Sequence, residues 1–365
     1  MAADSPAIAR EGGGIDQLMK DPQFSLVMPV YNGAAYLREA LASLRWQTLT
    51  DWECICVNDG SSDDSRTILE EFAAADSRFR VLHQENGGIV AALNRGIGEA
   101  RSPWIARMDA DDVAFPERLA VQARFLADHP ETSVLSAHMV CTDAAGLPVG
   151  LQAGPLGHSE IERRLLLGQN TINHPTVVMR REAVLAVGMY RSEFEWVEDV
   201  DLWLRMARTG TLATVPQVLL KYRLHEESVC ATRSDQQADR MQKLLAAVRV
   251  ERGLMAEGGE LSRRRLGKKR QTLASHKWAR RAARSGYYRT AWHYWSRQVS
   301  QTPLSPEAFR AGFEVGVRVG GALLAGKWPS RFLLPDWRAW DVAGEVSASR
   351  SLREPLHEGF LAGPC

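Results

Sequence analysis

Three carboxylates stand together in the segment Asp109-Ala110-Asp111-Asp112, directly after the apolar run 104–108. Alternate carboxylates on an extended chain point in opposite directions, but a turn at the end of a strand brings two of them onto one ligand. Hard oxygen ligands of this kind suit Mg²⁺ or Mn²⁺, and either cation binds a diphosphate. Short acidic runs are also common helix caps, and a helix is expected near Pro116. Taken alone, the cluster leaves a cation site and a solvated cap open.

Two further polar segments follow expected strands. Asp59, in the segment 57–62, can accept hydrogen bonds from a nucleobase or a ribose, or it can form an Asx turn before a helix. The segment 29–33 (Pro-Val-Tyr-Asn-Gly) offers Tyr31 as a ring that stacks on a nucleobase. A plain strand-to-helix turn explains the second segment equally well, so neither segment identifies a ligand alone.

The segment Glu85-Asn86-Gly87-Gly88 precedes an expected helix. Its free backbone N–H groups and the helix dipole can help to hold a phosphate. The chain contains neither the G-x-x-x-x-G-K-[ST] phosphate loop nor a G-x-G-x-x-G motif after a strand. Ordinary ATPase and dinucleotide-binding sites are therefore not indicated.

Acids also open the helix expected after Glu198, and this position has two explanations. The helix dipole favours acids in a first turn, which is a sufficient structural reason for them. The functional alternative makes Asp199 a general base that accepts the proton of an acceptor hydroxyl. His225 follows the last expected strand and can complete a metal shell or contact phosphate, although a lone surface histidine usually does neither.

Alternating apolar runs and helical patterns must position these residues. The first half of the chain predicts strands over 24–30, 52–57, 79–83 and 104–108, and helices over 36–45, 67–75 and 89–100. This order predicts an α/β sheet with mostly parallel strands, in which ligands bind at the carboxyl ends of the strands. The polar segments 29–33, 57–62, 85–88 and 109–112 all lie at such ends.

The second half is more mixed. It predicts strands over 133–140 and 176–179, a helix over 200–209, and a closing pair of strands, 211–215 and 218–223, around Pro216. Beyond residue 228 the segments 236–252, 261–285, 287–301 and 306–324 all have helical patterns. All charges between residues 261 and 290 are positive, and the sequence 283–287 predicts a hairpin between two of these helices. One such hairpin is not a repeat array.

The composition excludes several classes of protein. The chain has 365 residues, 45% of them hydrophobic and 24% charged, and a net charge of +1 that gives no reason to expect nucleic acid. Its five cysteines form no C-x-x-C pair, which favours reduced, buried thiols and a cytoplasmic protein. Residues 1–23 lack the apolar core of a signal peptide and are expected to be a mobile leader. No uninterrupted apolar run reaches about 18 residues, so a transmembrane helix is not expected.

The order of these motifs is more specific than any one of them. From 24 to 228 the chain closely resembles the family 2 glycosyltransferases, inverting enzymes that use nucleotide sugars and have the GT-A fold. The resemblance rests on the segments 27–32, 57–61, 86–88, 92–96, 107–112, 116–118, 174–175, 198–205 and 222–225. The acid that usually precedes Asp59 is Asn58 in this chain, which is a mild departure. Nothing in the family pattern matches the region after Ser228.

The resemblance implies a role for each matching residue. Asp111 binds a Mn²⁺ or Mg²⁺ ion, His225 lies near the metal or the diphosphate, Asp199 is the catalytic base, and Asp109 contacts ribose or sugar. Glu198 and Asp112 are placed at the donor or acceptor sugar. The remaining nucleotide contacts are Pro29, Tyr31, Asn32, Asp59, Asn86 and Gly88.

The whole chain is thus expected to be a GT-A-type nucleotide-binding α/β/α sandwich (24–228) with a mostly helical extension (229–330) and an irregular tail (331–365). It is expected to move a sugar from a nucleoside diphosphate, UDP being the first candidate, to a saccharide or lipid-linked acceptor in cell-surface polysaccharide or glycolipid synthesis. Two alternatives are a non-catalytic nucleotide-sugar-binding scaffold and a nucleotidyltransferase, although the basic loop that the second needs is absent from 29–33. The basic helices 261–290 are read either as a cap on the catalytic domain or as a peripheral contact with the inner face of the plasma membrane.

Overall fold

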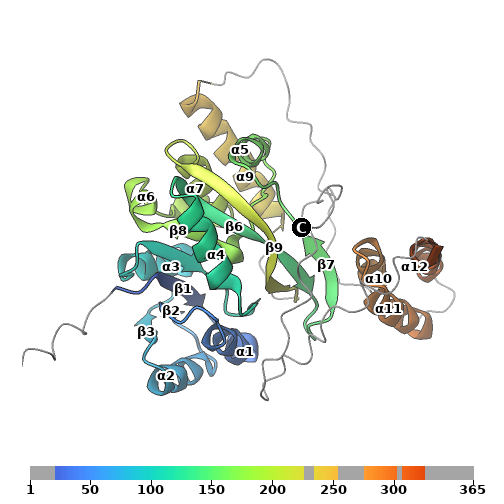
Figure 1. Cartoon of the computed structure of the whole chain (residues 1–365). Helices are drawn as coiled ribbons and strands as arrows, with labels where there is room; N and C mark the ends of the chain where they lie inside the picture. Colours follow the sequence, from blue (N-terminus) through green and yellow to red (C-terminus); the bar gives the residue numbers. More distant parts are fainter. Residues whose placement is uncertain (1–20, 226–233, 254–274, 302–305, 325–365) are drawn as a thin grey trace, which may run out of the picture.

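A mixed β-sheet with helices on both faces forms the main body of the protein (Figure 1). The computed structural model describes residues 21–225, 234–253, 275–301 and 306–324. Most of the expected leader, the irregular tail and the basic segment 261–274 lie outside these described residues.

The first half of the sheet follows the expected order closely. Four neighbouring strands run parallel in the order β3-β2-β1-β4. They are β1 (Phe24–Val30), β2 (Trp52–Asp59), β3 (Phe79–Gln84) and β4 (Trp104–Arg107), joined by α1 (Ala34–Arg45), α2 (Ser65–Ala75) and α3 (Gly88–Gly98). Because parallel neighbours end at the same edge, the segments after β1, β2 and β4 are brought together there.

The second half corrects two expectations. The sheet continues as β4-β8-β6-β9-β5 with β7 beside β6, and only the pair β6–β9 is parallel, so the complete sheet is mixed rather than mostly parallel. The expected closing pair around Pro216 is one strand, whose pairing with β6 skips Pro216 and Gln217 in an irregularity that absorbs the missing N–H. The strands are β5 (Val113–Ala114), β6 (Thr132–Thr142), β7 (Pro148–Gln152), β8 (Val178–Arg180) and β9 (Thr211–Arg223).

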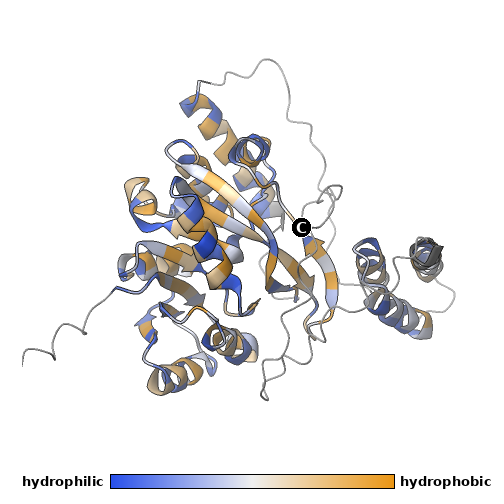
Figure 2. Ribbon diagram, viewed as in Figure 1, coloured by the Kyte–Doolittle hydropathy of each residue, from blue (hydrophilic) through white to orange (hydrophobic). Residues whose placement is uncertain are grey.

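Two apolar layers cover the sheet, as the alternation in β1 shows. Leu26 and Met28 belong to the layer that includes α1 and α2, whereas Val27 belongs to the layer on the other face. There α3 comes so close that a Cβ on Gly96 would lie 2.4 Å from Cγ1 of Val27. Apolar residues of the sheet are thus enclosed between helices whose outer faces are polar (Figure 2). The remaining elements are α4 (Arg118–Asp128), α5 (His158–Leu166), η1 (His174–Thr176), α6 (Arg181–Ala186), η2 (Ser192–Phe194), α7 (Glu198–Met206) and α9 (Ser234–Glu251).

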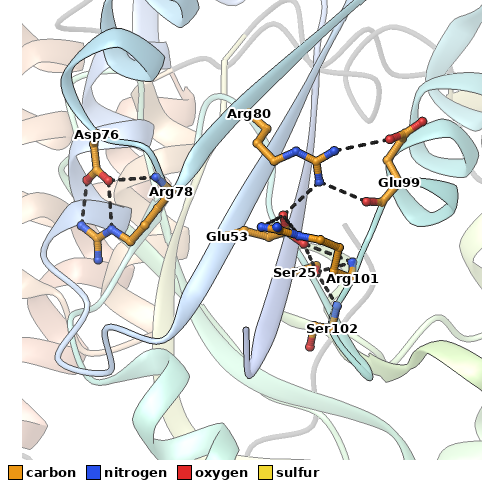
Figure 3. Close-up of polar contacts among 8 residues, drawn as sticks. All are labelled: Ser25, Glu53, Asp76, Arg78, Arg80, Glu99, Arg101 and Ser102. Atoms are coloured by element: carbon orange, nitrogen blue, oxygen red, sulfur yellow. Dashed lines mark hydrogen bonds and ion pairs between the residues drawn. The ribbon is translucent and has the colours of Figure 1, made fainter. Parts of the chain in front are cut away.

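A buried carboxylate joins the starts of neighbouring strands, at the end of the sheet opposite to the polar segments (Figure 3). Glu53 is 2% exposed and accepts hydrogen bonds from Ser25 Oγ at 2.7 Å, Arg80 and Arg101. Burial tends to raise the pKa of Glu53, but these donors outweigh burial and hold the pKa below its usual range. All three donors are thereby tied to β2, and the cluster is structural.

Three C-terminal helices form a separate unit beside β7 (Figure 1). α10 (Ser275–Arg284) and α11 (Tyr288–Gln301) are the expected hairpin, and α12 (Pro306–Leu324) packs against both. Trp278 and Ala282 of α10 share an apolar cluster with Val149 of β7. The Tyr294 hydroxyl also donates a hydrogen bond to the Asp143 carboxylate at the end of β6. Among the described residues, no helix is long and apolar enough to cross a membrane.

Candidate active site

The acidic turn follows β4 and gathers three carboxylates. Ligand oxygens of Asp109, Asp111 and Asp112 all lie within 4.8 Å of one another. Asp112 is fully buried, and its Oδ2 has no hydrogen-bond partner while Oδ1 accepts from the Arg223 N–H at 3.0 Å. Burial raises the pKa of Asp109 to about 6 and the pKa of Asp112 well above its usual value, and the neighbouring acids add to both shifts. An orphaned buried oxygen among crowded acids fits a divalent cation.

His225 reaches the same turn from the segment after β9. Its Nε2 lies 2.9 Å from Oδ2 of Asp111, although 114 residues separate the two in sequence. The imidazole side chain is 16% exposed and the carboxylate 31%, so both remain accessible to a ligand. The two residues that the resemblance assigns to the metal are therefore in direct contact, and an imidazole beside carboxylates is a donor set that Mn²⁺ accepts.

The predicted sugar contact of Asp112 does not fit its position. Its side chain is 0% exposed, so it has no surface to offer a sugar in this conformation. The reason is the fold of the turn, which directs Asp112 inward to the backbone of Arg223 while Asp111 stays at the surface. Asp112 instead joins the acidic turn to β9 through its hydrogen bond with the Arg223 N–H.

Arg107 is paired with this acidic turn. Its side chain is 4% exposed and forms a two-pronged ion pair with Asp109. Burial raises the pKa values of Glu198 and Asp199, and the positive charge of Arg107 opposes both shifts. Because the influence of a charge weakens with distance, the acidic turn and the start of α7 belong to the same region of the protein.

Glu198 and Asp199 begin α7 with different exposures. Burial raises the pKa of Glu198 to about 8, the charge of Asp199 adds to that shift, and Glu198 Oε2 has no partner. Asp199 is partly exposed, and Asn170 donates a hydrogen bond to its Oδ2 at 2.6 Å. Burial raises the pKa of Asp199, while hydrogen bonds from the Val200 N–H and Asn170 oppose the shift. Asp199 is thus the carboxylate of the pair that a substrate can reach.

Asp59 lies at the end of β2, and its carboxylate is hydrogen-bonded to the loop 84–88. Its carboxylate accepts hydrogen bonds from Gln84 at 2.7 Å, from the Gly87 N–H at 2.8 Å and from the Gly88 N–H at 2.9 Å. The N–H groups that the sequence offers to a phosphate are therefore already donated to Asp59, because a nearby carboxylate is a strong acceptor. Only 3% of Asp59 is exposed, so in this structure it shapes the loop 84–88.

The loop 84–88 also touches the segment that leads to α7. A Cβ on Gly88 would lie 3.3 Å from Oε1 of Glu195, and Gly88 has a φ of +83°, which favours glycine. The loop that binds Asp59 therefore lies close to Glu195, three residues before Glu198. Asn86 is exposed at the tip of the same loop.

The segment after β1 is the most exposed part of the rim. Tyr31 is 57% exposed, which leaves its ring free to cover a planar ligand. Asn32 has a φ of +49°, and its Oδ1 accepts the Ser62 N–H at 2.8 Å, so it joins the turns after β1 and β2. Pro29 is partly buried in β1.

Comparison with known sequences shows the family to which this chain belongs. The sequence model of glycosyl transferase family 2 matches residues 25–188. The chain is 32% identical over 210 residues to the amylovoran biosynthesis glycosyltransferase AmsE of Erwinia amylovora, which covers 56% of this chain and 78% of AmsE. The chain belongs to glycosyl transferase family 2. An uncharacterized glycosyltransferase of Haemophilus influenzae is 29% identical to this glycosyltransferase over 237 residues, or 61% of the chain and 72% of that protein.

The fold of this glycosyltransferase is that of the GT-A enzymes. The crystal structure of S. aureus TarS 1-349 in complex with UDP-GlcNAc superposes with a TM-score of 0.54 at 17% sequence identity, over 84% of this chain and 93% of that one. The expected α/β/α sandwich with a C-terminal helical region is thereby confirmed.

Three residues of the candidate site have no role assigned from the sequence. Arg107 belongs to the segment 107–112 of the resemblance but stands in an apolar strand, and Asn170 lies in a loop without a recognisable motif. Arg223 was read only as part of the segment 222–225, yet its guanidinium binds the backbone oxygens of Asp111 and Ala144. A charged residue within an apolar strand is the one signal that points to Arg107.

Proposed function

We propose that this glycosyltransferase moves a sugar from a nucleoside-diphosphate sugar to an acceptor hydroxyl with inversion at the anomeric carbon. The observation that carries the proposal is the arrangement around Arg107. The Arg107 guanidinium is ion-paired with Asp109 of the acidic turn that His225 contacts, and its positive charge also acts on the accessible carboxylate of Asp199. A group that binds a diphosphate and a group that deprotonates an alcohol thus share one rim of the sheet.

The residues after β4 would hold a divalent cation. Asp111 and His225 are its exposed ligands, and Asp109 and Asp112 complete the negative environment. A Mn²⁺ or Mg²⁺ ion bound there supplies Lewis-acid stabilisation of the charge on the departing diphosphate. Arg107 keeps the Asp109 carboxylate in one orientation, so that Asp109 can accept hydrogen bonds from the ribose or the sugar.

Asp199 acts as the general base in this proposal. Its carboxylate accepts the proton of the acceptor hydroxyl while that oxygen bonds to the anomeric carbon and the diphosphate leaves from the opposite face. Glu198, buried beside it with a raised pKa, keeps its proton near neutral pH and so adds little negative charge to the base. Asn170 orients the Asp199 carboxylate by binding Oδ2.

The role of Asn170 predicts a change in pH dependence. Its amide stabilises the charged form of Asp199, so Asn170→Ala should raise the pKa of that carboxyl and move the acid limb of the kcat–pH profile to higher pH. The variant should be slowest relative to the parent at low pH and approach it above the limb. Gln169→Ala, at an exposed neighbouring amide, is the matched control and should keep the parent profile. An unmoved limb in Asn170→Ala would exclude this role.

The biological setting and the donor rest on relatives. AmsE is named for amylovoran biosynthesis, which supports a place in cell-surface polysaccharide or glycolipid synthesis. TarS binds UDP-GlcNAc, which supports a UDP-sugar here. The exposed ring of Tyr31 would cover the base, together with Pro29 and the turn at Asn32. We further propose that 24–228 is the catalytic unit and 229–330 a helical extension, followed by the tail 331–365.

A screen of nucleotide sugars tests the proposal. With Mn²⁺ or Mg²⁺ present, the true donor should raise the Tm, because a ligand that binds only the folded state stabilises it by mass action. Donor at 100 times its Kd should add about 2.7 kcal/mol to the free energy of unfolding. The same donor should then be hydrolysed slowly, with metal and without acceptor. Stabilisation without hydrolysis or transfer would indicate a sugar-nucleotide-binding scaffold instead.

A further inference from the structure

Helix α12 has an apolar face that no part of the described structure covers. Ala308, Ala311 and Val315 are buried at a spacing of three and four residues, so they form the stripe that packs on the hairpin. Phe313 is 72% exposed and Val317 58%, and these two lie one turn apart. Exposed apolar side chains that lie next to each other on a surface helix indicate a candidate interaction site.

The neighbouring helix adds an aromatic pair. Trp292 of α11 is 60% exposed, and its ring centroid lies 4.8 Å from that of Trp295. Trp295 in turn donates a hydrogen bond to the Ala308 carbonyl at 3.1 Å and contacts Gly312, the residue before Phe313. Trp295 therefore connects Trp292 to α12. We call Trp292, Phe313 and Val317 the outer apolar face.

Exposed arginines lie beside this face. The three helices carry eight lysine and arginine residues against two glutamates. Glu314 is engaged by Arg280 and Arg284 of α10, so these two arginines serve the packing of the helices. Arg310 is exposed on the same side of α12 as Phe313 and Val317, and Arg289 is exposed one turn before Trp292 on α11.

We propose that the outer apolar face and its arginines dock the protein on an anionic lipid surface. Tryptophan, phenylalanine and valine side chains enter the boundary between headgroups and acyl chains, and tryptophan is enriched at that depth. Arginine stems extend along the apolar surface while their guanidinium groups meet the lipid phosphates. The positive charge selects a lipid surface over a second copy of this chain, because two copies facing each other would bring like charges together.

This docking surface differs from the one that the sequence suggested. Within the described part of the 261–290 segment, Arg280 and Arg284 are paired with Glu314, and Arg281 lies over Gly150 of β7. These three arginines of α10 are thus paired with or packed against other parts of the protein. The exposed apolar groups belong to α11 and α12, and of the three C-terminal helices α12 lies furthest from β7 in Figure 1.

Co-sedimentation of the full chain with vesicles tests the proposal. The probes are vesicles of phosphatidylcholine alone and vesicles that also contain phosphatidylglycerol. The parent should bind the second kind, and added salt should weaken binding through charge screening. The triple variant Trp292→Ser, Phe313→Ser, Val317→Ser should bind more than about tenfold more weakly, since each side chain loses its apolar contact. The double variant Arg289→Gln, Arg310→Gln should bind about thirtyfold more weakly.

The matched control replaces three exposed apolar residues elsewhere. Leu167→Ser, Leu185→Ser, Val250→Ser changes side chains that are 50%, 39% and 83% exposed and should bind vesicles as the parent does. Circular dichroism and the Tm verify that all variants fold. Equal binding by the parent and the outer-face triple variant would overturn the proposal. So would a parent that ignores phosphatidylglycerol and forms oligomers that the triple variant abolishes, because the face would then join copies of the chain.

Discussion

Asp199→Asn is expected to lower kcat by about 10² to 10⁴-fold, the range that a positioned general base contributes. The amide keeps the shape of the side chain and can still contact Asn170, but it cannot accept the acceptor's proton. Donor affinity should stay near that of the parent because the diphosphate site that we propose is at Asp111 and His225, which are in contact with each other. Single-turnover transfer and a donor titration measure the two effects separately.

Two control variants are needed to interpret the result for Asp199→Asn. Glu193→Gln changes a 64% exposed acid a few residues before α7 and should leave turnover unchanged. The variant Glu198→Gln removes the buried neighbour's charge and should spare most of the activity, since Glu198 is already held protonated near neutral pH. Near-parental turnover in Asp199→Asn would show that another group takes the proton.

Asp111→Ala should lose metal-dependent donor binding. Even an outer partner of a metal ligand typically contributes about 10 to 100-fold to metal affinity, so removal of a direct ligand should cost at least as much. The physical reason is that His225 alone, beside Asp109 paired with Arg107, leaves too little negative charge to hold the cation and the diphosphate together. Titration of the nucleotide sugar with and without Mn²⁺ measures the loss.

The control for this variant is Asp128→Ala, at an exposed acid of α4, which should bind the donor as the parent does. His225→Ala should weaken binding in the same direction by a smaller factor, because the carboxylate carries the charge. If Asp111→Ala binds the donor with unchanged metal dependence, the cation site lies elsewhere. Asp199→Asn and Asp111→Ala thus distinguish loss of the proposed base from loss of the proposed diphosphate site.

Local patterns were enough for the first half of the fold. The alternation of Leu26, Val27 and Met28 marks a strand buried on both faces, and the helices between strands follow the apolar spacing. The helix ends differ by a few residues, as in α1, which begins at Ala34 rather than Tyr36. The second half was harder because the pairings of β8, β6 and β9 join segments that are distant in sequence. Turn signals such as Pro216 were over-interpreted there, since neighbouring strands can absorb them.

The sequence by itself determined which residues can do chemistry: three acids after one strand, an acid at a helix start and a late histidine, in the order typical of the family. Only the tertiary structure decided which of these residues are buried, which are accessible and which contact one another. It turned Asp59 toward the loop 84–88, buried Asp112, brought His225 to Asp111 and paired Arg107 with Asp109. The reason is that residue type follows from the local chain, whereas exposure, pairing and charge coupling depend on contacts between residues far apart in the sequence.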